Sequence, residues 1–210
     1  MALTVLVTGA RGQLGTELLQ AFPGHEVQGT TADVGDRDAV HATVLEVRPD
    51  RVVHAGAWTD VDGCEGDPDR AFRSNALGTR NVVEAARRVG AHVAYISSDY
   101  VFDGETDRPY VEWDEPNPLS VYGRSKLAGE RELHPGDTVV RTSWVCGRTG
   151  RNFVKTMLRL ATEGDGPVSV VADQVGCPTF AADLARTVAR LSIDARPGVF
   201  HVTNQGGAVS

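Results

Sequence analysis

Short apolar stretches rich in β-branched residues alternate along the chain with segments of helical periodicity. The apolar stretches predict strands at residues 3–8, 26–31, 51–55, 91–97, 138–144, 168–172 and 199–203. Between them, apolar residues recur at spacings of three and four, which predicts helices at residues 13–22, 36–47, 68–89, 121–133, 152–163 and 182–193. Strands that alternate with helices form a parallel sheet through right-handed crossovers. We therefore expect a doubly wound α/β fold with helices on both faces of the sheet.

The regular alternation weakens after about residue 151, where glycine and proline interrupt the pattern at 164–167 and 176–178. We expect a main domain at residues 1–145 and a smaller C-terminal lobe at residues 146–210, interleaved with it. The chain stops at residues 205–210, directly after a predicted strand and a turn. From this ending we expect the lobe to be incomplete.

The composition excludes several classes of protein. The 210 residues carry a formal net charge of −7 and a pI near 5.3, which argues against nucleic acid or an anionic membrane as a partner. No apolar run is long enough for a membrane span, and the N-terminal apolar run ends in a glycine turn, unlike a signal peptide. The cysteines at 64, 146 and 177 form no Cys-x-x-Cys motif. We therefore expect a reduced, cytoplasmic protein without structural zinc.

Gly9, Gly12 and Gly15 follow the first predicted strand and open the first predicted helix. In this context the GxxGxxG spacing is typical of a Rossmann-type dinucleotide site, because glycines allow a tight turn and close approach to a pyrophosphate. A purely structural turn is the alternative. Arg11 lies inside the turn, where a guanidinium can reach a 2′-phosphate. This favours NADPH as the cofactor, with NADH tolerated.

Asp33 follows the second predicted strand, near the usual position of a ribose-binding acid. A solvated loop aspartate is an equally open interpretation.

Tyr122 and Lys126 lie one helical turn apart in the predicted helix 121–133. A nearby ammonium and an oxidised nicotinamide would lower the pKa of a phenol, so the pair predicts a proton relay. Ser98 ends an apolar strand at the edge where open parallel sheets bind ligands, and its hydroxyl can donate to a substrate carbonyl. Spacing alone does not choose between Ser97 and Ser98, and both serines can instead serve turn backbone.

Several of these segments together resemble the extended short-chain dehydrogenase/reductase family. The segments that carry the resemblance are 9–15, 54–57, 97–102, 122–126 and 141–144. Within that family, the motifs at 57–62, 141–145, 152–157, 173–174 and 178–179 are similar to the dTDP-4-dehydrorhamnose reductase family. The likeness runs through essentially the whole chain, with the motifs in family order.

The resemblance implies reduction of dTDP-4-dehydro-β-L-rhamnose to dTDP-β-L-rhamnose with NADPH or NADH. It implies that Tyr122 is the acid, that Lys126 modulates it and anchors the ribose, and that Ser98 is the hydroxyl partner. In this family the pair matching Asp33 and Val34 holds the adenine side, which replaces the ribose interpretation. The expected cofactor contacts are Gly9, Arg11, Gly12, Gln13, Leu14, Gly15, Asp33, Val34, Ala55, Gly56, Ala57, Tyr122 and Lys126. The expected substrate contacts are Thr59, Val61, Ser98, Asp99, Tyr100 and Trp144.

The chain departs from the family pattern at several positions. Serine stands at 98 in place of threonine, which keeps the donor, and Trp58 stands where histidine is frequent. His54-Ala-Gly-Ala replaces the more usual Asn-Ala-Ala-Ala. Family members also continue for another helix-rich segment after the equivalent of Ser210, so we expect nucleotide binding with poor turnover.

Metal and partners follow from the same resemblance. Some members hold Mg²⁺ through glutamates at a dimer interface; Glu17 matches one of them, but Ala181 and Ala182 stand where another is expected. We therefore expect no metal, a dTDP-sugar as the partner molecule, and leave a homodimer open.

Three alternatives remain. A related dTDP-4-keto-sugar reductase of the dTDP-dihydrostreptose type shares these motifs, because the stereochemical outcome depends on the shape of the pocket. A non-catalytic NADP-binding regulatory subunit, as in methionine adenosyltransferase, would not need the intact Ser98, Tyr122 and Lys126. An epimerase or dehydratase shares the fold, but Asp99-Tyr100 replaces the Asp-Glu pair suited to elimination.

Overall fold

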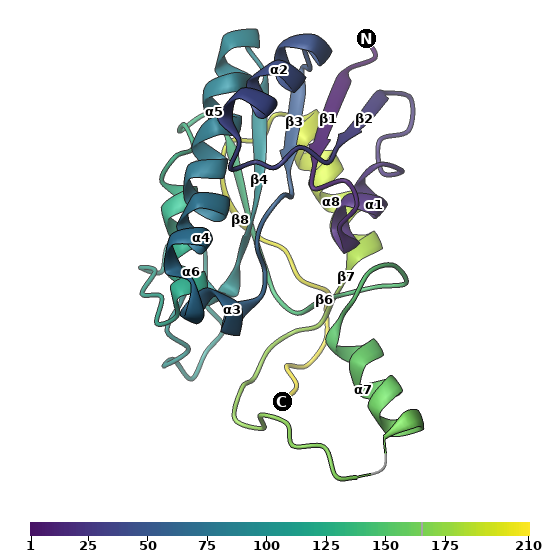
Figure 1. The fold of residues 1–210 in the computed structure, drawn as a ribbon, viewed down its shortest axis with the longest axis vertical. Coiled ribbons are helices and arrows are strands. Elements are labelled where there is room, and N and C mark those ends of the chain that lie inside the picture. The colour runs from purple at the N-terminus through teal and green to yellow at the C-terminus, as the bar shows by residue number, and fades with distance from the viewer. Residues whose placement is uncertain (165) are drawn as a thin grey trace.

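The structure is a computed structural model that describes residues 1–164 and 166–210. Six parallel strands form the central sheet in the order β2-β1-β3-β4-β5-β8 (Figure 1). The strands are β1 (Thr4–Thr8), β2 (Glu26–Thr30), β3 (Arg51–His54), β4 (His92–Ser98), β5 (Thr138–Thr142) and β8 (Gly198–His201). Val5, Val7, Val52 and Val53 are fully buried, as strands covered on both faces require.

Helices cover both faces of the sheet (Figure 1). One face carries α1 (Gln13–Leu18) and α8 (Ala181–Ile193), which share an apolar core with β1, β3 and β5. The other carries α2 (Arg37–Val47) and α5 (Gly78–Val89), with α6 (Val121–Glu130) beside them. The predicted doubly wound α/β fold is confirmed.

The predicted helix at 68–89 is three segments. It begins as α4 (Pro68–Phe72), widens into a π-helical turn, η1 (Arg73–Leu77), and continues as α5. Gly90 ends α5 with a φ of +75°, as a left-handed helix terminus requires. Two short helical elements in the described residues have no counterpart in the sequence analysis: α3 (Val61–Gly66) and a 3₁₀ turn, η2 (Asp99–Val101).

After β5 the chain leaves the sheet and then returns to it. It forms β6 (Val145–Cys146), which pairs with β7 (Thr179–Phe180), and α7 (Phe153–Glu163), which extends away from the sheet (Figure 1). The chain then returns as α8 and β8. The division of the chain at residue 145 stays a prediction.

The predicted strand at 168–172 is wrong. Residues 168–172 form no regular structure and are exposed. Valines at 168, 170 and 171 produced the strand-like pattern, but a strand needs a neighbour that accepts its backbone hydrogen bonds. In the described part of the chain this segment pairs with none.

Candidate active site

The glycine turn between β1 and α1 is packed against the end of β3. Gly9 has a φ of +66°, and a Cβ there would lie 2.8 Å from the Ala55 carbonyl and from Gly56. A Cβ on Gly15 would lie 2.1 Å from the Gly9 carbonyl oxygen. Gly12 precedes the first residue of α1. Side chains at Gly9 and Gly15 would therefore collide with the protein's own backbone, so glycine at these positions allows the tight strand-to-helix turn that is typical of a dinucleotide site.

The residues expected at the adenine side of the cofactor pack against the residues that follow β3. Val34 is buried, and its Cγ1 would lie 3.1 Å from a Cβ on Gly56. The Gly56 amide donates to Thr8 Oγ1 at 3.2 Å, which joins β3 to β1. Asp33 accepts the Gly35 amide at 2.9 Å in an Asx turn, so its carboxylate already orders its own loop.

Three other expected cofactor residues differ in their exposure and in their contacts. Arg11 is exposed, whereas Leu14 is packed into the core of the sheet. The Gln13 side chain faces the C-terminal part of the chain: its Nε2 donates to Val145 O at 2.9 Å, and its Oε1 accepts Asn152 Nδ2 at 2.8 Å. The backbone of Gln13 and Leu14 remains beside the glycine turn.

Ser98 and Tyr122 are brought together by the packing of α6 on the end of β4. Ser120 caps α6 by accepting the Gly123 amide at 3.0 Å, so Tyr122 is the second residue of the helix. A Cβ on Gly123 would lie 2.1 Å from the Tyr100 carbonyl oxygen, which shows how closely α6 approaches. The Tyr122 and Tyr100 rings meet edge to face at 5.5 Å.

Burial controls the ionisation of Tyr122. It raises the pKa of the phenol well above 10, while a hydrogen bond with Ser98 lowers it, and the neighbours Asp99 and Cys64 raise it further. Lys126 is not among the groups that shift the pKa of Tyr122, and the expectation that Lys126 together with an oxidised nicotinamide acidifies this phenol stays a prediction. Tyr122 is therefore a protonated phenol near neutral pH, which is the state that a proton donor needs.

The two neighbouring serines have different partners. Ser97 Oγ donates to Glu130 Oε1 at 2.5 Å, on the helix side of β4. Ser98 Oγ donates to Asp99 Oδ1 at 2.9 Å and accepts the Tyr100 amide at 3.3 Å. Burial raises the pKa of Asp99. Of the two serines, Ser98 is the one that faces Tyr122.

The Lys126 side chain is buried against β4. It is 2% exposed, and its Nζ donates to Ile96 O at 2.7 Å and lies 4.2 Å from the centre of the Tyr95 ring. Burial lowers the pKa of Lys126 to about 7, and Glu130 acts against that lowering. The ammonium is held by a backbone carbonyl and an aromatic face.

The sequence analysis named His54 only as a departure from the family pattern and gave no role to this residue, which ends β3. The imidazole is fully buried, with Nδ1 at 2.7 Å from Thr8 Oγ1 and Nε2 at 3.1 Å from Thr79 Oγ1. Because Thr79 Oγ1 donates to Asn75 O at 2.7 Å, its lone pairs face Nε2–H. Burial and the nearby Lys126 lower the pKa of His54 to about 3, so the ring is neutral. Its apolar strand context gave no signal beyond a buried polar residue.

Asn75 is a residue that the sequence analysis missed. Its side chain is fully buried in η1; its Oδ1 accepts the Trp58 amide at 2.8 Å, and its Nδ2 donates to Trp58 O at 3.0 Å and Ser125 Oγ at 2.9 Å. Ser125 Oγ in turn donates to Tyr122 O. Asn75 therefore joins the loop after β3 to the helix that carries Tyr122.

Only some of the expected substrate residues lie close to Tyr122. Val61 and Tyr100 pack in one apolar cluster with Tyr122, whereas Thr59 is exposed. Tyr100 also forms a hydrogen bond with Gln174, in the segment after α7. Trp144 has a φ of +46°, and a Cβ on Gly176 would lie 2.8 Å from its ring.

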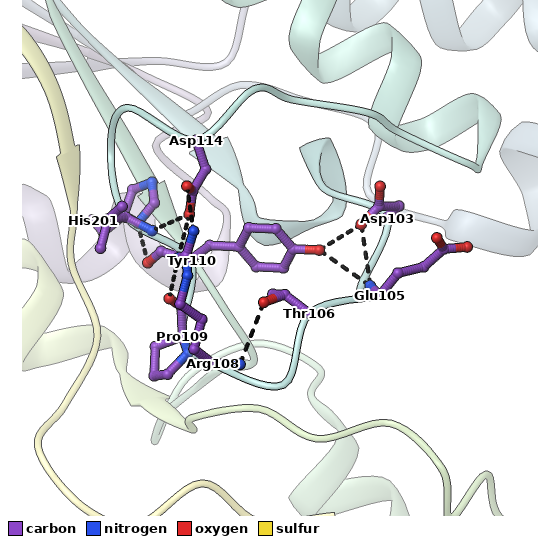
Figure 2. Close-up of polar contacts among 9 residues, drawn as sticks. Asp103, Glu105, Thr106, Arg108, Pro109, Tyr110, Asp114 and His201 are labelled. Atoms are coloured by element: carbon purple, nitrogen blue, oxygen red, sulfur yellow. Dashed lines mark hydrogen bonds and ion pairs between the residues drawn. The ribbon is translucent and has the colours of Figure 1, made fainter.

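The loop that joins η2 to α6 is held by its own side chains (Figure 2). Tyr110 Oη donates to Asp103 Oδ1 at 2.5 Å and accepts the Gly104 amide at 2.9 Å. Arg108 forms a two-pronged ion pair with Asp114, at 2.7 Å for each bond. These contacts fix the connection between the strand of Ser98 and the helix of Tyr122.

Among the described residues, no group of three or more histidine, cysteine, aspartate or glutamate side chains is arranged to hold a metal ion. No helix in the described residues has the length and apolar character needed to cross a bilayer.

Comparison with known proteins extends the resemblance. The sequence profile described as the RmlD substrate binding domain matches residues 3–210. A dTDP-4-dehydrorhamnose reductase of Sinorhizobium fredii is 43% identical, over 96% of this chain and 73% of the relative. The spore coat polysaccharide biosynthesis protein SpsK of Bacillus subtilis is 42% identical, over 96% of this chain and 74% of the relative.

The fold is also similar to solved structures. The crystal structure of dTDP-4-dehydrorhamnose reductase from Bacillus anthracis in complex with NADP aligns with a TM-score of 0.93 at 41% identity. That alignment covers 100% of this chain and 77% of the other. The similarity thus includes the glycine turn and the whole edge of the sheet at which Ser98 and Tyr122 lie.

Proposed function

Because the chain belongs to the RmlD substrate-binding domain family, whose relatives include dTDP-4-dehydrorhamnose reductases, we propose that it reduces the 4-keto group of dTDP-4-dehydro-β-L-rhamnose. The product of this reaction is dTDP-β-L-rhamnose. The observation that carries the proposal is the meeting of Ser98 and the protonated, buried Tyr122 at the carboxyl end of β4. Ligands of open parallel sheets bind at this edge.

A nicotinamide dinucleotide, NADPH with NADH tolerated, supplies the hydride for this chemistry when it is bound. The residues that would hold it are the glycine turn, the Ala55–Ala57 segment that packs on that turn, and the Asp33–Val34 loop. The exposed guanidinium of Arg11 is free to approach a 2′-phosphate, which supports NADPH.

The protein's own groups handle the proton and orient the sugar. Tyr122 donates its phenolic proton to the sugar O4, and the neighbouring Ser98 hydroxyl donates to the carbonyl and orients it. For Ser98 to donate to the carbonyl, its hydrogen turns away from Asp99 Oδ1, where it now points. Lys126 stabilises the phenolate that remains and holds the ribose.

The proposal is tested by incubating the purified protein with dTDP-4-dehydro-β-L-rhamnose and either NADPH or NADH. We expect loss of nicotinamide absorbance and an NMR spectrum of dTDP-β-L-rhamnose. A product with different stereochemistry at C4 would identify a related dTDP-4-keto-sugar reductase. Nucleotide binding without any turnover would favour the regulatory-subunit alternative.

We also propose that the protein acts in the cytoplasm, which the three free cysteines support. The homodimer that the sequence left open stays a prediction.

A further inference from the structure

A buried ion pair lies one helical turn beyond Lys126. Arg141 of β5 donates from Nε to Glu130 Oε1 at 2.9 Å and from Nη2 to Oε2 at 2.7 Å. Both side chains are 7% exposed. Ser97 Oγ adds a third hydrogen bond to Oε1 at 2.5 Å. The Glu130 carboxylate is therefore fixed by three donors from two strands.

This carboxylate is held beside the Lys126 ammonium. Lys126 and Glu130 are four residues apart in α6, so their side chains lie on the same face of the helix. Both side chains also reach neighbouring residues of β4, because Lys126 Nζ donates to Ile96 O and Glu130 accepts from Ser97. The strand and the helix thus hold both charged groups on one face of α6, against neighbouring residues of β4, where the Glu130 charge acts on Lys126.

The other titratable groups around Lys126 are neutral. His54 from β3 is uncharged at neutral pH, because its pKa is lowered to about 3. Burial raises the pKa of Tyr95 from β4 and of Tyr122 from α6, so both phenols keep their protons. Glu130 remains as the anion that acts on Lys126, and its charge opposes the lowering of the Lys126 pKa by burial. Among the described residues, Arg141 is the further charged group in this cluster, and it is bound to Glu130.

We propose that Glu130 is a positioning residue of the reductase: held by Arg141 and Ser97, its carboxylate is the counter-charge that keeps the buried Lys126 cationic. The role of that cation in turnover rests on the proposed function. The electrostatic part concerns the protein alone, because an isolated ammonium in a low-dielectric interior gives up its proton unless an anion lies near it.

The test uses the fact that the chain has two lysines, Lys126 and Lys155. Protein labelled with ¹³C at the lysine ε carbon gives two NMR signals, whose pH titrations report the two ammonium groups separately. We expect the Lys126 midpoint near 7 in the wild-type protein. In Glu130→Gln it should fall by about one pH unit or more. An unchanged Lys126 midpoint in the folded variant would overturn the proposal.

Two further variants separate the charge effect from damage to the fold. Glu130→Leu combined with Arg141→Met replaces the ion pair by apolar side chains, which proteins tolerate better than one unpaired charge. It should lower the Lys126 midpoint as well, and an unchanged midpoint in this folded variant would also contradict the proposal. Glu132→Gln is the matched control, because Glu132 lies two residues further along and pairs with Arg80 at the surface. It should leave the Lys126 midpoint in place.

Activity supplies an independent readout. If Lys126 must be charged, the rate of sugar reduction falls as pH rises through its pKa. Glu130→Gln should move this alkaline limb to lower pH and retain more of the wild-type rate at pH 6 than at pH 8. An equal loss of rate at every pH would indicate that Glu130 has a merely structural role. It would overturn the claim that Glu130 supports turnover through the charge of Lys126. A shifted Lys126 midpoint in a protein that never reduces the sugar would support the electrostatic part and refute the proposed function.

Discussion

Burial displaces the pKa values of Tyr122 and Lys126 in opposite directions. Because both groups are buried, the neutral form of each is favoured, so the phenol holds its proton and the ammonium tends to lose one. The raised pKa of Tyr122 suits a proton donor. The lowered pKa of Lys126 works against a lysine that must be cationic. The spacing of Tyr122 and Lys126 predicts which residues meet, but the partners Ile96 and Tyr95 come from a strand about thirty residues earlier.

The buried ammonium should make the protein less stable than it could be. Lys126→Met leaves Glu130 paired with Arg141 and removes the charge, so we expect the free energy of unfolding at pH 7 to rise by about 1–4 kcal/mol while activity is lost. Urea denaturation measures the change. Lys155→Met is the control: Lys155 is exposed, and its substitution should change stability by less than about 0.5 kcal/mol.

The stability gain of Lys126→Met should depend on pH with a definite sign. The pKa of Lys126 is about 7 in the folded state and near 10.5 when unfolded, so the unfolded state binds more protons between these values. The contribution of Lys126 to wild-type stability therefore rises with pH across this window, and the cost of burying its charge is complete only below pH 7. The advantage of Lys126→Met should shrink as pH increases from 7 to 10. A stability difference between the two proteins that stays constant with pH would show that folding does not lower the pKa of Lys126.

Gly15 tests the packing of the glycine turn. In Gly15→Ala, the new Cβ would lie 2.1 Å from the Gly9 carbonyl oxygen, which cannot be relieved without moving the turn. We expect a loss of about 2–4 kcal/mol in the free energy of unfolding and weaker NADPH binding, measured by denaturation and by calorimetry. Gly66→Ala serves as the control, since a Cβ there meets nothing within 4 Å. Equal effects of the two substitutions would contradict the described turn.

At the scale of elements, the π-helical turn η1 places one side chain where a regular helix would not. Asn75, within this turn between α4 and α5, bonds both backbone groups of Trp58. Such turns are frequent at functional sites. Here the turn supports the loop that follows β3, and through Ser125 it supports the start of α6.

Removing the Asn75 amide should disturb both of these elements. In Asn75→Ala the Trp58 amide and carbonyl lose their buried partners, so we expect a loss of about 2–4 kcal/mol in the free energy of unfolding. The KM for NADPH should rise more than kcat falls, because the loop at 55–57 packs on the glycine turn. Asn117→Ala, at an exposed hydrogen bond to Asp103, is the control. A response no larger than that of the control would exclude the bridging role.

Most elements of the sheet could be predicted from the sequence, since strands such as β1 and β3 place buried valines on both faces and α5 has an apolar stripe. The π-turn could not, because a continuous apolar stripe runs from 68 to 89 and the interruption depends on partners far away in the chain. The short helix α3 has too few residues to show a period. Valines at 168–171 suggested a strand whose existence depends on a neighbour.

At the scale of the whole molecule, the site is assembled from separate parts of the chain at one edge of the sheet. The glycine turn comes from the N-terminus, Ser98 from β4 and Tyr122 from α6. Gln13 then links the turn to Val145 and Asn152, in the part of the chain that leads to α7. Motif spacing identified these residues singly. The contacts between them depend on tertiary packing, and so do the roles of His54 and Glu130.

The central claim is that the buried phenol of Tyr122 delivers the proton. Its most direct test compares Tyr122→Phe with the wild-type protein for turnover of dTDP-4-dehydro-β-L-rhamnose with NADPH, and for NADPH affinity. We predict that turnover falls by about 10²–10⁴-fold while NADPH affinity changes by less than about threefold, because Tyr122→Phe retains the ring and removes the proton. A wild-type rate in Tyr122→Phe would contradict the claim.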